Sequence, residues 1–202
     1  MESSDADLVQ QALAGSQAAC HALVSRYAAP AVNFAARMVQ DRALAEDLAQ
    51  EAFARAFQNL SSFDQQRRFL TWFLQILHNL TIDYLRRKRP LTVSLDAMEE
   101  AGHPVTAATP PADSPAAQAE QLALAAAMDA ALARIRPEYR EAVVLQYRED
   151  LSLQEIADVM NVPIGTVKTY LHRARKELAA ILSAQGWAST PARAETRRRE
   201  IP

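Results

Sequence analysis

The segment between residues 152 and 178 restricts the possible fold more than any other part of the sequence. It reads SLQEIADVMNVPIGTVKTYLHRARKEL. Ser152 and Glu155 have the spacing of a capping box, which predicts the start of a helix. Asn161 tolerates the left-handed conformation of a tight turn, and Pro163 ends one helix while suiting the start of the next. The pattern therefore predicts two short helices joined by a turn, a helix-turn-helix.

The second helix of this motif, which starts at Ile164, has an apolar and a polar side. Its expected buried positions are 164, 167, 171, 174 and 178. At about 100° per residue, the other side carries small, hydroxyl and basic residues, which suit base edges and phosphates. An ordinary solvated helix face would explain the charges but not the capping box and the turn. The candidate contacts with duplex DNA are Gly165, Thr166, Lys168, Thr169, His172, Arg173, Arg175 and Lys176.

Composition favours helices in the rest of the chain as well. Half of the 202 residues are apolar, enough for a buried core, and four glycines are too few for an all-β or nucleotide-binding fold. No apolar run approaches the roughly 18 residues that span a bilayer, so no membrane insertion is expected. The amino-terminal residues are acidic and lack a signal-peptide pattern, which favours a cytoplasmic location.

The sequence offers no constellation for catalysis or metal binding. The single cysteine, Cys20, excludes a disulfide scaffold and a multi-cysteine metal site. The four histidines are scattered, and no phosphate-binding glycine loop is present. We therefore expect no enzyme activity, no metal and no cofactor.

Charge is segregated along the chain although the formal net charge is only −2. Residues 67–89 hold six basic side chains and one acidic one, whereas residues 90–121 hold five acidic side chains and no basic one. The stretch 90–117 also contains half of the ten prolines, so it predicts a flexible linker between two helical domains. The expected organisation is all-α, with domains at 1–89 and 118–182 and a disordered tail at 183–202.

Helical spacing of apolar residues and capping signals set the expected elements. Asp5 is expected to cap the first helix, and Ser16 the second, which Pro30 kinks or divides before about Gln40. The other expected helices are 43–60, 69–88, 118–136 and 137–149, followed by the two helices of the motif.

Both domains resemble one protein family. The sequences DRALAEDLAQEAFARAFQNLSSFD and FLTWFLQILHNLTIDYLRRKR, followed by a linker and REAVVLQYREDLSLQEIADVMNVPIGTVKTYLHRARKEL, resemble the extracytoplasmic-function (ECF) sigma factors of bacterial RNA polymerase. The resemblance covers about 1–89 as sigma region 2 and 119–182 as region 4. It implies a factor that binds core polymerase and directs initiation at promoters with a −10 and a −35 element. The helix-turn-helix would then read the −35 duplex.

The resemblance also implies how region 2 is used. An acidic face on the helix 43–60 would bind the clamp helices of the polymerase β′ subunit, and region 4 would contact the β flap. The residues of this face are Asp47, Gln50, Glu51 and Gln58.

The −10 element would be read as a separated strand by the loop 61–68 and by one face of the helix 69–88. Thr71, His78 and Ile82 are expected on this face, opposite a buried stripe that includes Phe69 and Phe73. The aromatic residues of the stripe are interpreted as core packing. The candidate −10 contacts are Phe63, Arg67, Arg68, Gln75, His78, Asn79, Arg86 and Arg87.

Two other functions remain open from the residues alone. One is a sigma-like decoy or adaptor that binds an anti-sigma factor, and the other is a stand-alone helix-turn-helix regulator. The family also suggests an anti-sigma factor as a partner of a genuine sigma factor. The expected mechanism is weak DNA binding by each domain, made selective when polymerase holds both at the correct separation.

Overall fold

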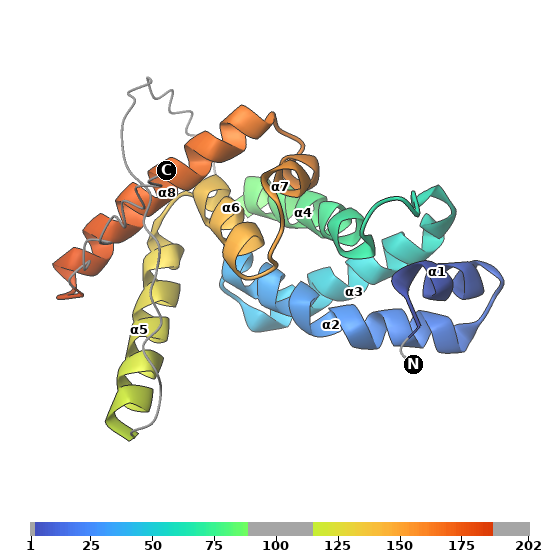
Figure 1. Ribbon diagram of the computed structural model, residues 1–202, viewed down its shortest axis with the longest axis horizontal. Helices are drawn as coiled ribbons and strands as arrows, with labels where there is room; N and C mark the ends of the chain where they lie inside the picture. Colours follow the sequence, from blue (N-terminus) through green and yellow to red (C-terminus); the bar gives the residue numbers. More distant parts are fainter. Residues whose placement is uncertain (1–2, 89–114, 188–202) are drawn as a thin grey trace, which may run out of the picture.

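The structure is a computed structural model that describes residues 3–88 and 115–187. We call these ranges the N-terminal half and the C-terminal half (Figure 1). Within them the chain forms eight α-helices, one short 3-10 helix and no strand, so the expected all-α class with two helical regions is confirmed. The elements are α1 (Asp5–Leu13), α2 (Gln17–Val39), α3 (Arg42–Gln58), η1 (Leu60–Ser62), α4 (Phe69–Lys88), α5 (Pro115–Arg134), α6 (Pro137–Tyr147), α7 (Leu153–Met160) and α8 (Ile164–Ala184).

Polar side chains cap the first helices of the N-terminal half. Ser4, rather than the expected Asp5, caps α1, because its hydroxyl accepts the N–H of Asp7 while the Asp7 carboxylate accepts the N–H of Ser4 at 3.2 Å. Ser16 caps α2 as predicted, and Asp41 caps α3. Each of these oxygens satisfies a donor that has no partner within its helix.

Pro30, which was expected to kink or divide this stretch, does not divide α2. The helix continues from Gln17 to Val39 and ends at Gln40, whose φ of 59° is left-handed. Proline removes one backbone hydrogen bond of a helix. The flanking turns are held because Ala31, Phe34 and Ala35 are fully buried, and tertiary packing of such a face stabilises a helix more than local preference does.

The C-terminal half starts earlier than its sequence suggests. Helix α5 begins at Pro115, so residues 115–117 of the expected linker are helical. The remaining part of that linker, and residues 188–202 of the expected tail, lie outside the described residues, while residues 183–184 belong to α8.

The helix-turn-helix forms as predicted. Ser152 and Glu155 make the capping box, and Asn161 has φ 52° and ψ 48° in the turn between α7 and α8. These signals are local to the segment, which is why the sequence located both helices correctly.

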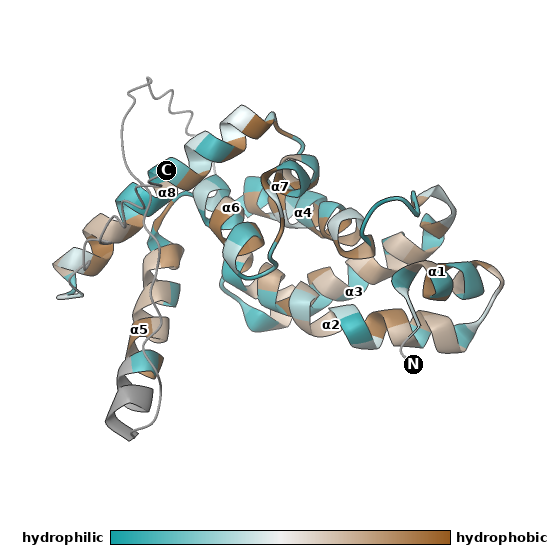
Figure 2. Ribbon diagram, viewed as in Figure 1, coloured by the Kyte–Doolittle hydropathy of each residue, from teal (hydrophilic) through white to brown (hydrophobic). Residues whose placement is uncertain are grey.

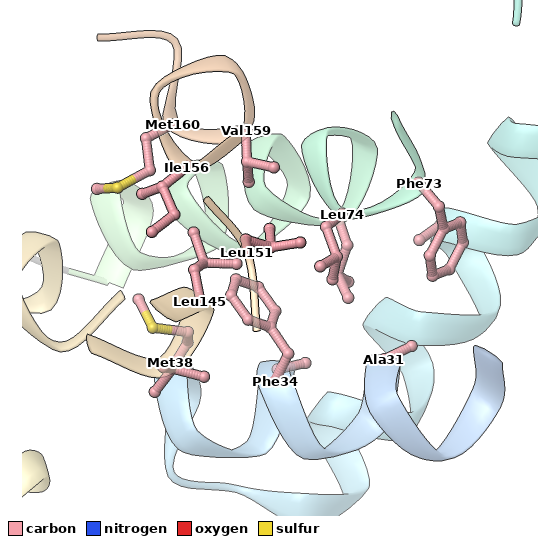
Figure 3. Packing of buried hydrophobic residues seen from close by; sticks show 14 of the residues in the cluster. Ala31, Phe34, Met38, Phe73, Leu74, Leu145, Leu151, Ile156, Val159 and Met160 are labelled. Carbon is pink, nitrogen blue, oxygen red and sulfur yellow. The ribbon is translucent and has the colours of Figure 1, made fainter. Parts of the chain in front are cut away.

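The two halves pack against each other over a continuous apolar core, which we call the junction. Helices α6 and α7 lie on α2 and α4, and α5 also contacts α2 (Figure 1). Side chains from both halves meet in one cluster, with Phe34 and Met38 on one side and Leu145, Leu151 and Val159 on the other (Figure 3). The tether expected from sequence did not predict this contact.

Candidate nucleic-acid and polymerase interfaces

Helix α8 presents a hydrophilic face to solvent. Val167, Leu171 and Ala174 are buried and fix the helix on the body of the C-terminal half. Hydrophilic residues recur along the helix on its outer side (Figure 2). Of the predicted −35 contacts, Gly165, Lys168, Thr169 and Lys176 are exposed, and Thr166, His172, Arg173 and Arg175 are half-buried.

Two basic side chains of α8 are held by internal hydrogen bonds. Arg175 donates to the carbonyl oxygen of Leu171 at 3.1 Å, and Arg173 donates to the hydroxyl of Tyr139 at 3.2 Å. A Cβ atom at Gly165 would meet nothing within 4 Å, so the protein itself does not require glycine there. The open space at this position allows a DNA backbone to approach the first turn of α8 closely.

The face of α4 that was expected to be free is covered by the C-terminal half. Thr71 and His78 are 2% and 9% exposed. The Thr71 hydroxyl donates to Glu155 of α7 at 3.0 Å, and His78 Nδ1 forms a short hydrogen bond with Glu141 of α6. The expectation that these two residues lie on an uncovered face is therefore wrong in this structure, because α6 and α7 pack there.

The basic loop before α4 is also engaged by α7. Arg67 pairs with Asp158 at 2.5 Å, and Arg68 pairs with Glu155 at 3.3 Å. A groove of about 370 Å³ remains beside this contact, lined by Arg67, Gln75, Asp158 and residues of the turn between α7 and α8.

The other predicted −10 residues lie in different surroundings. Asn79, Arg86 and Arg87 are exposed, and Gln75 is half-buried. Phe63 was predicted to contact the −10 strand, but it is buried, with its ring centroid 5.6 Å from that of Phe69, because it packs into the aromatic core.

Helix α3 carries the acidic face predicted to bind polymerase. Asp47, Gln50, Glu51 and Gln58 are all exposed, while alanines on the opposite side are buried against the rest of the N-terminal half. Glu51 forms an ion pair with Arg55 at 2.7 Å, one turn further along the helix. The face is therefore accessible to a basic partner surface.

The charged residues at the centre of the junction, Arg140 and Glu141, were not predicted from the sequence. The buried guanidinium of Arg140 donates to the carbonyl oxygens of Arg37 and Met38 at the end of α2, and also to three carbonyl oxygens of the C-terminal half. Burial lowers the pKa of Arg140. Glu141, 1% exposed, pairs with His78. The only signal in the sequence was the pair of adjacent charges directly before the apolar stretch AVVLQY, and it names no partner.

The pKa of Glu155, a carboxyl group in the junction, is also shifted. Partial burial works to raise the pKa of its carboxyl, but hydrogen bonds from Ser152 and Thr71 and the charge of Arg68 outweigh burial. The pKa of Glu155 therefore lies below its usual value, and the ionised form is the one that the junction stabilises.

Over residues 3–88 and 115–187, no group of three or more His, Cys, Asp or Glu side chains is arranged to hold a metal ion. No helix in the same ranges has the length and apolar character needed to cross a membrane. Cys20 is half-buried.

Comparisons with known proteins match a family model to each half of the chain. The family model Sigma-70 region 2 matches residues 23–90, and the model Sigma-70, region 4 matches residues 125–178. The chain is similar to the ECF RNA polymerase sigma factor SigW of Bacillus subtilis, at 38% identity over 173 residues that cover 84% of this chain and 92% of SigW. It is also similar to the RNA polymerase sigma factor CarQ of Myxococcus xanthus, at 33% identity over 83% of this chain and 91% of CarQ.

Two solved structures share the fold. CnrH in complex with the cytosolic domain of CnrY superimposes with a TM-score of 0.65 at 26% identity, over 89% of this chain and 97% of that chain. The sigma factor RpoE in complex with the anti-sigma factor NepR, from Bartonella quintana, gives a TM-score of 0.59 at 20% identity over 81% of this chain and 96% of that chain.

A chain that carries sigma regions 2 and 4 on an all-α scaffold is a sigma-70-type factor, a transcription initiation factor. Identity to SigW across nearly its whole length narrows the class further. The chain belongs to the ECF group of RNA polymerase sigma factors.

Proposed function

We propose that this sigma factor binds core RNA polymerase through the acidic face of α3 and reads two promoter elements with α4 and α8. The observation that carries the proposal is that one chain exposes two surfaces of opposite charge. One is acidic, around Asp47 and Glu51, and the other is basic, around Lys168 and Lys176. A factor that bridges a polymerase and DNA needs one surface of each kind.

The α3 face is the docking surface for polymerase in this proposal. Asp47, Gln50, Glu51 and Gln58 are exposed on one side of a rigid helix, so a basic helical partner can contact them together. We assign that partner to the β′ clamp helices and place the β flap against the C-terminal half. Complementary charge at such a surface speeds association and fixes the register of the two partners.

Helix α8 reads the −35 element as duplex in this proposal. It has the exposed polar face and the preceding α7 that a recognition helix in the major groove requires. Lys168, Thr169 and His172 are assigned to base edges or adjacent phosphates, and Arg175 and Lys176 to phosphates.

Helix α4 and its preceding loop read the −10 element as a single strand. Asn79, exposed in the middle of α4, is assigned to a flipped base because an amide can donate to and accept from base edges. Arg67, Arg68, Arg86 and Arg87 are assigned to phosphates, which position the strand without reading its sequence.

An anti-sigma factor is the further partner that we infer. CnrH is seen with CnrY, and RpoE with the anti-sigma factor NepR, and both share the fold of this chain. We place the protein in the cytoplasm, where core polymerase and promoters are found.

Transcription in vitro with bacterial core polymerase on a promoter library tests the proposal. The chain is expected to direct initiation from a subset of promoters that share −10 and −35 sequences. A start-site distribution identical to that of core polymerase alone would contradict it.

The docking surface is tested by the variant Asp47→Lys/Glu51→Lys. Like charges then face the polymerase, which costs several kcal/mol, so affinity for core polymerase should fall about a hundredfold or more. The matched control is Glu46→Lys/Asp83→Lys, which makes the same charge change at two other exposed residues of the N-terminal half. Equal losses in both variants would contradict the assignment of the α3 face.

A further inference from the structure

At the junction, two carboxylates form ion pairs with the arginines that the proposed function assigns to promoter phosphates. Arg67 and Arg68 lie in the loop before α4, and their partners Asp158 and Glu155 lie one turn apart on α7. A carboxylate and a phosphate offer a guanidinium the same kind of contact, an anionic oxygen acceptor. Each of the two arginines therefore binds a DNA phosphate more weakly while it is paired with a carboxylate of α7.

From this geometry we propose that α7 is an internal competitor for promoter DNA. Glu155 and Asp158 occupy the places of two phosphates of the −10 strand, so the free sigma factor is closed toward that strand until α7 leaves α4. The inference rests on the proposed function, since it assumes that the loop and α4 bind the −10 strand.

Contacts made by uncharged side chains make the covering of α4 specific. Thr71 donates to Glu155, and Gln154 donates to Asp158 at 3.1 Å, which orients the second carboxylate toward Arg67. Val159, directly after Asp158 on α7, is fully buried. A charged pair without such packing would exchange readily with solvent.

The junction also gives the reason why DNA alone is not expected to open the molecule. Separation of the halves would expose Val159, Leu145 and Phe34, all fully buried. It would also leave the carbonyl oxygens of Arg37 and Met38 without the Arg140 guanidinium. Exposure of apolar surface and loss of buried hydrogen bonds are both unfavourable. Opening is therefore expected when polymerase supplies replacement contacts to both halves.

Only one of the two DNA surfaces is covered. Gly165, Lys168 and Thr169 of α8 stay exposed in the closed arrangement. The free factor is thus expected to bind duplex DNA weakly through α8 and to bind single strands more weakly than its loop arginines would allow.

The test uses the full chain with Glu155→Gln/Asp158→Asn. Glutamine can keep the capping box with Ser152, and both changes keep the size of the side chain. Each change removes one charge and replaces one acceptor oxygen by an NH2 group, so the contacts of that oxygen with α4 and its loop are lost as well. The probe is a fluorescent single-stranded DNA of random sequence, whose affinity is measured by anisotropy in a series of salt concentrations.

Affinity for this probe is expected to rise about three- to tenfold at low salt, because two arginines become available to phosphates. The slope of log K against log salt should steepen by about 1.4, since each contact with a single strand contributes about 0.7. The control Glu138→Gln/Asp150→Asn removes the same charge from two exposed residues of the C-terminal half. It is expected to change affinity by less than about twofold with an unchanged slope.

Equal gains in the two variants would overturn the inference, because general charge repulsion would then explain the effect. No gain in either variant would overturn it as well. Circular dichroism of both variants confirms that helix content is retained.

A charge swap provides a second test that needs no DNA. Asp158→Arg alone should raise the equilibrium constant for unfolding in urea about threefold or more, and adding Arg67→Asp should restore most of that loss. Absence of rescue would overturn the pairing itself. Failure of the wild-type chain to direct transcription would instead contradict the proposed function, while the charge swap would still report on the closed arrangement.

Discussion

The two helices proposed to read promoter DNA, α4 and α8, differ in what surrounds them. Helix α8 shows its basic face to solvent, whereas α4 has Thr71 and His78 buried under the C-terminal half. Both helices have a polar face opposite a buried stripe, so their sequences look alike in this respect. The difference teaches that a polar helix face can be a surface for a partner or one side of a contact within the same chain.

The difference between α4 and α8 predicts an order of events at a promoter. An open α8 can sample duplex DNA in the free protein, while the covered part of α4 and the loop before it become available after the junction separates. Reading of the −35 duplex is therefore expected to be less dependent on polymerase than capture of the −10 strand.

The largest expected effect tests whether the junction is a single cooperative structure. Arg140→Ala removes the donors to carbonyl oxygens at the end of α2 and in the C-terminal half. The free energy of unfolding should fall by about 3–5 kcal/mol, because buried acceptors lose a charged partner. Urea denaturation followed by circular dichroism measures the loss.

The matched control for this variant is Arg134→Ala, an exposed arginine in the last turn of α5. It should change stability by less than about 0.5 kcal/mol. A loss below about 1 kcal/mol for Arg140→Ala would show that the halves are not held together as the structure has them.

The next prediction compares the two DNA surfaces directly in the free protein. Lys168→Ala should weaken duplex binding about tenfold at low salt and reduce the salt slope by about 0.9, the contribution of one phosphate contact. Arg67→Ala should change single-strand binding by less than about twofold, since Asp158 already occupies this arginine. Fluorescence anisotropy with duplex and single-stranded probes measures both.

If Lys168→Ala weakened duplex binding and Arg67→Ala weakened single-strand binding to the same extent, both surfaces would be equally available in the free protein, which contradicts the account. In the complex with core polymerase, however, Arg67→Ala is expected to reduce promoter opening, because there α4 is uncovered.

The smallest effect concerns pH. The pKa of Glu155 in the folded protein lies below its ordinary value of 4.5. The stabilisation by its ionised form is therefore fully present above about pH 4.5 and is lost as the pH falls through the folded-state pKa. Wild type should exceed Glu155→Gln in stability at about pH 6, and the difference should shrink toward about pH 3.

Urea denaturation of both proteins over this range gives the measurement. A difference that stays constant with pH would show that the carboxylate charge of Glu155 does not contribute to the junction.

Local signals in the sequence located the elements of the motif well. The capping box at Ser152, the turn residue Asn161 and Pro163 act within a few residues of one another, and α7 and the start of α8 form where they predict. Helix α4 also spans Phe69–Lys88 as expected, because its apolar stripe is long and regular. In contrast, Pro30 was expected to kink or divide α2, and the helix is not divided, because burial of the neighbouring side chains keeps it continuous.

Contacts between distant parts of the chain could not be predicted in the same way. Periodicity showed that Thr71 and His78 share a polar face, but the groups that they bond, Glu155 and Glu141, are 84 and 63 residues further along the chain. Arg140 bonds to backbone carbonyl oxygens, which have no signature in the sequence. Candidate residues for DNA and polymerase binding could therefore be named from the sequence, while their exposure or burial in the free protein could not be predicted.

The most direct test of the closed arrangement is the distance between the halves in the free protein. Nitroxide labels at Ala54→Cys of α3 and Ala180→Cys of α8, both exposed positions, in a Cys20→Ser background allow double electron–electron resonance. The account predicts one narrow distance population for the free sigma factor and its replacement by a longer one when core polymerase is added. A broad distribution in the free protein, or a narrow one that polymerase leaves unchanged, would contradict it.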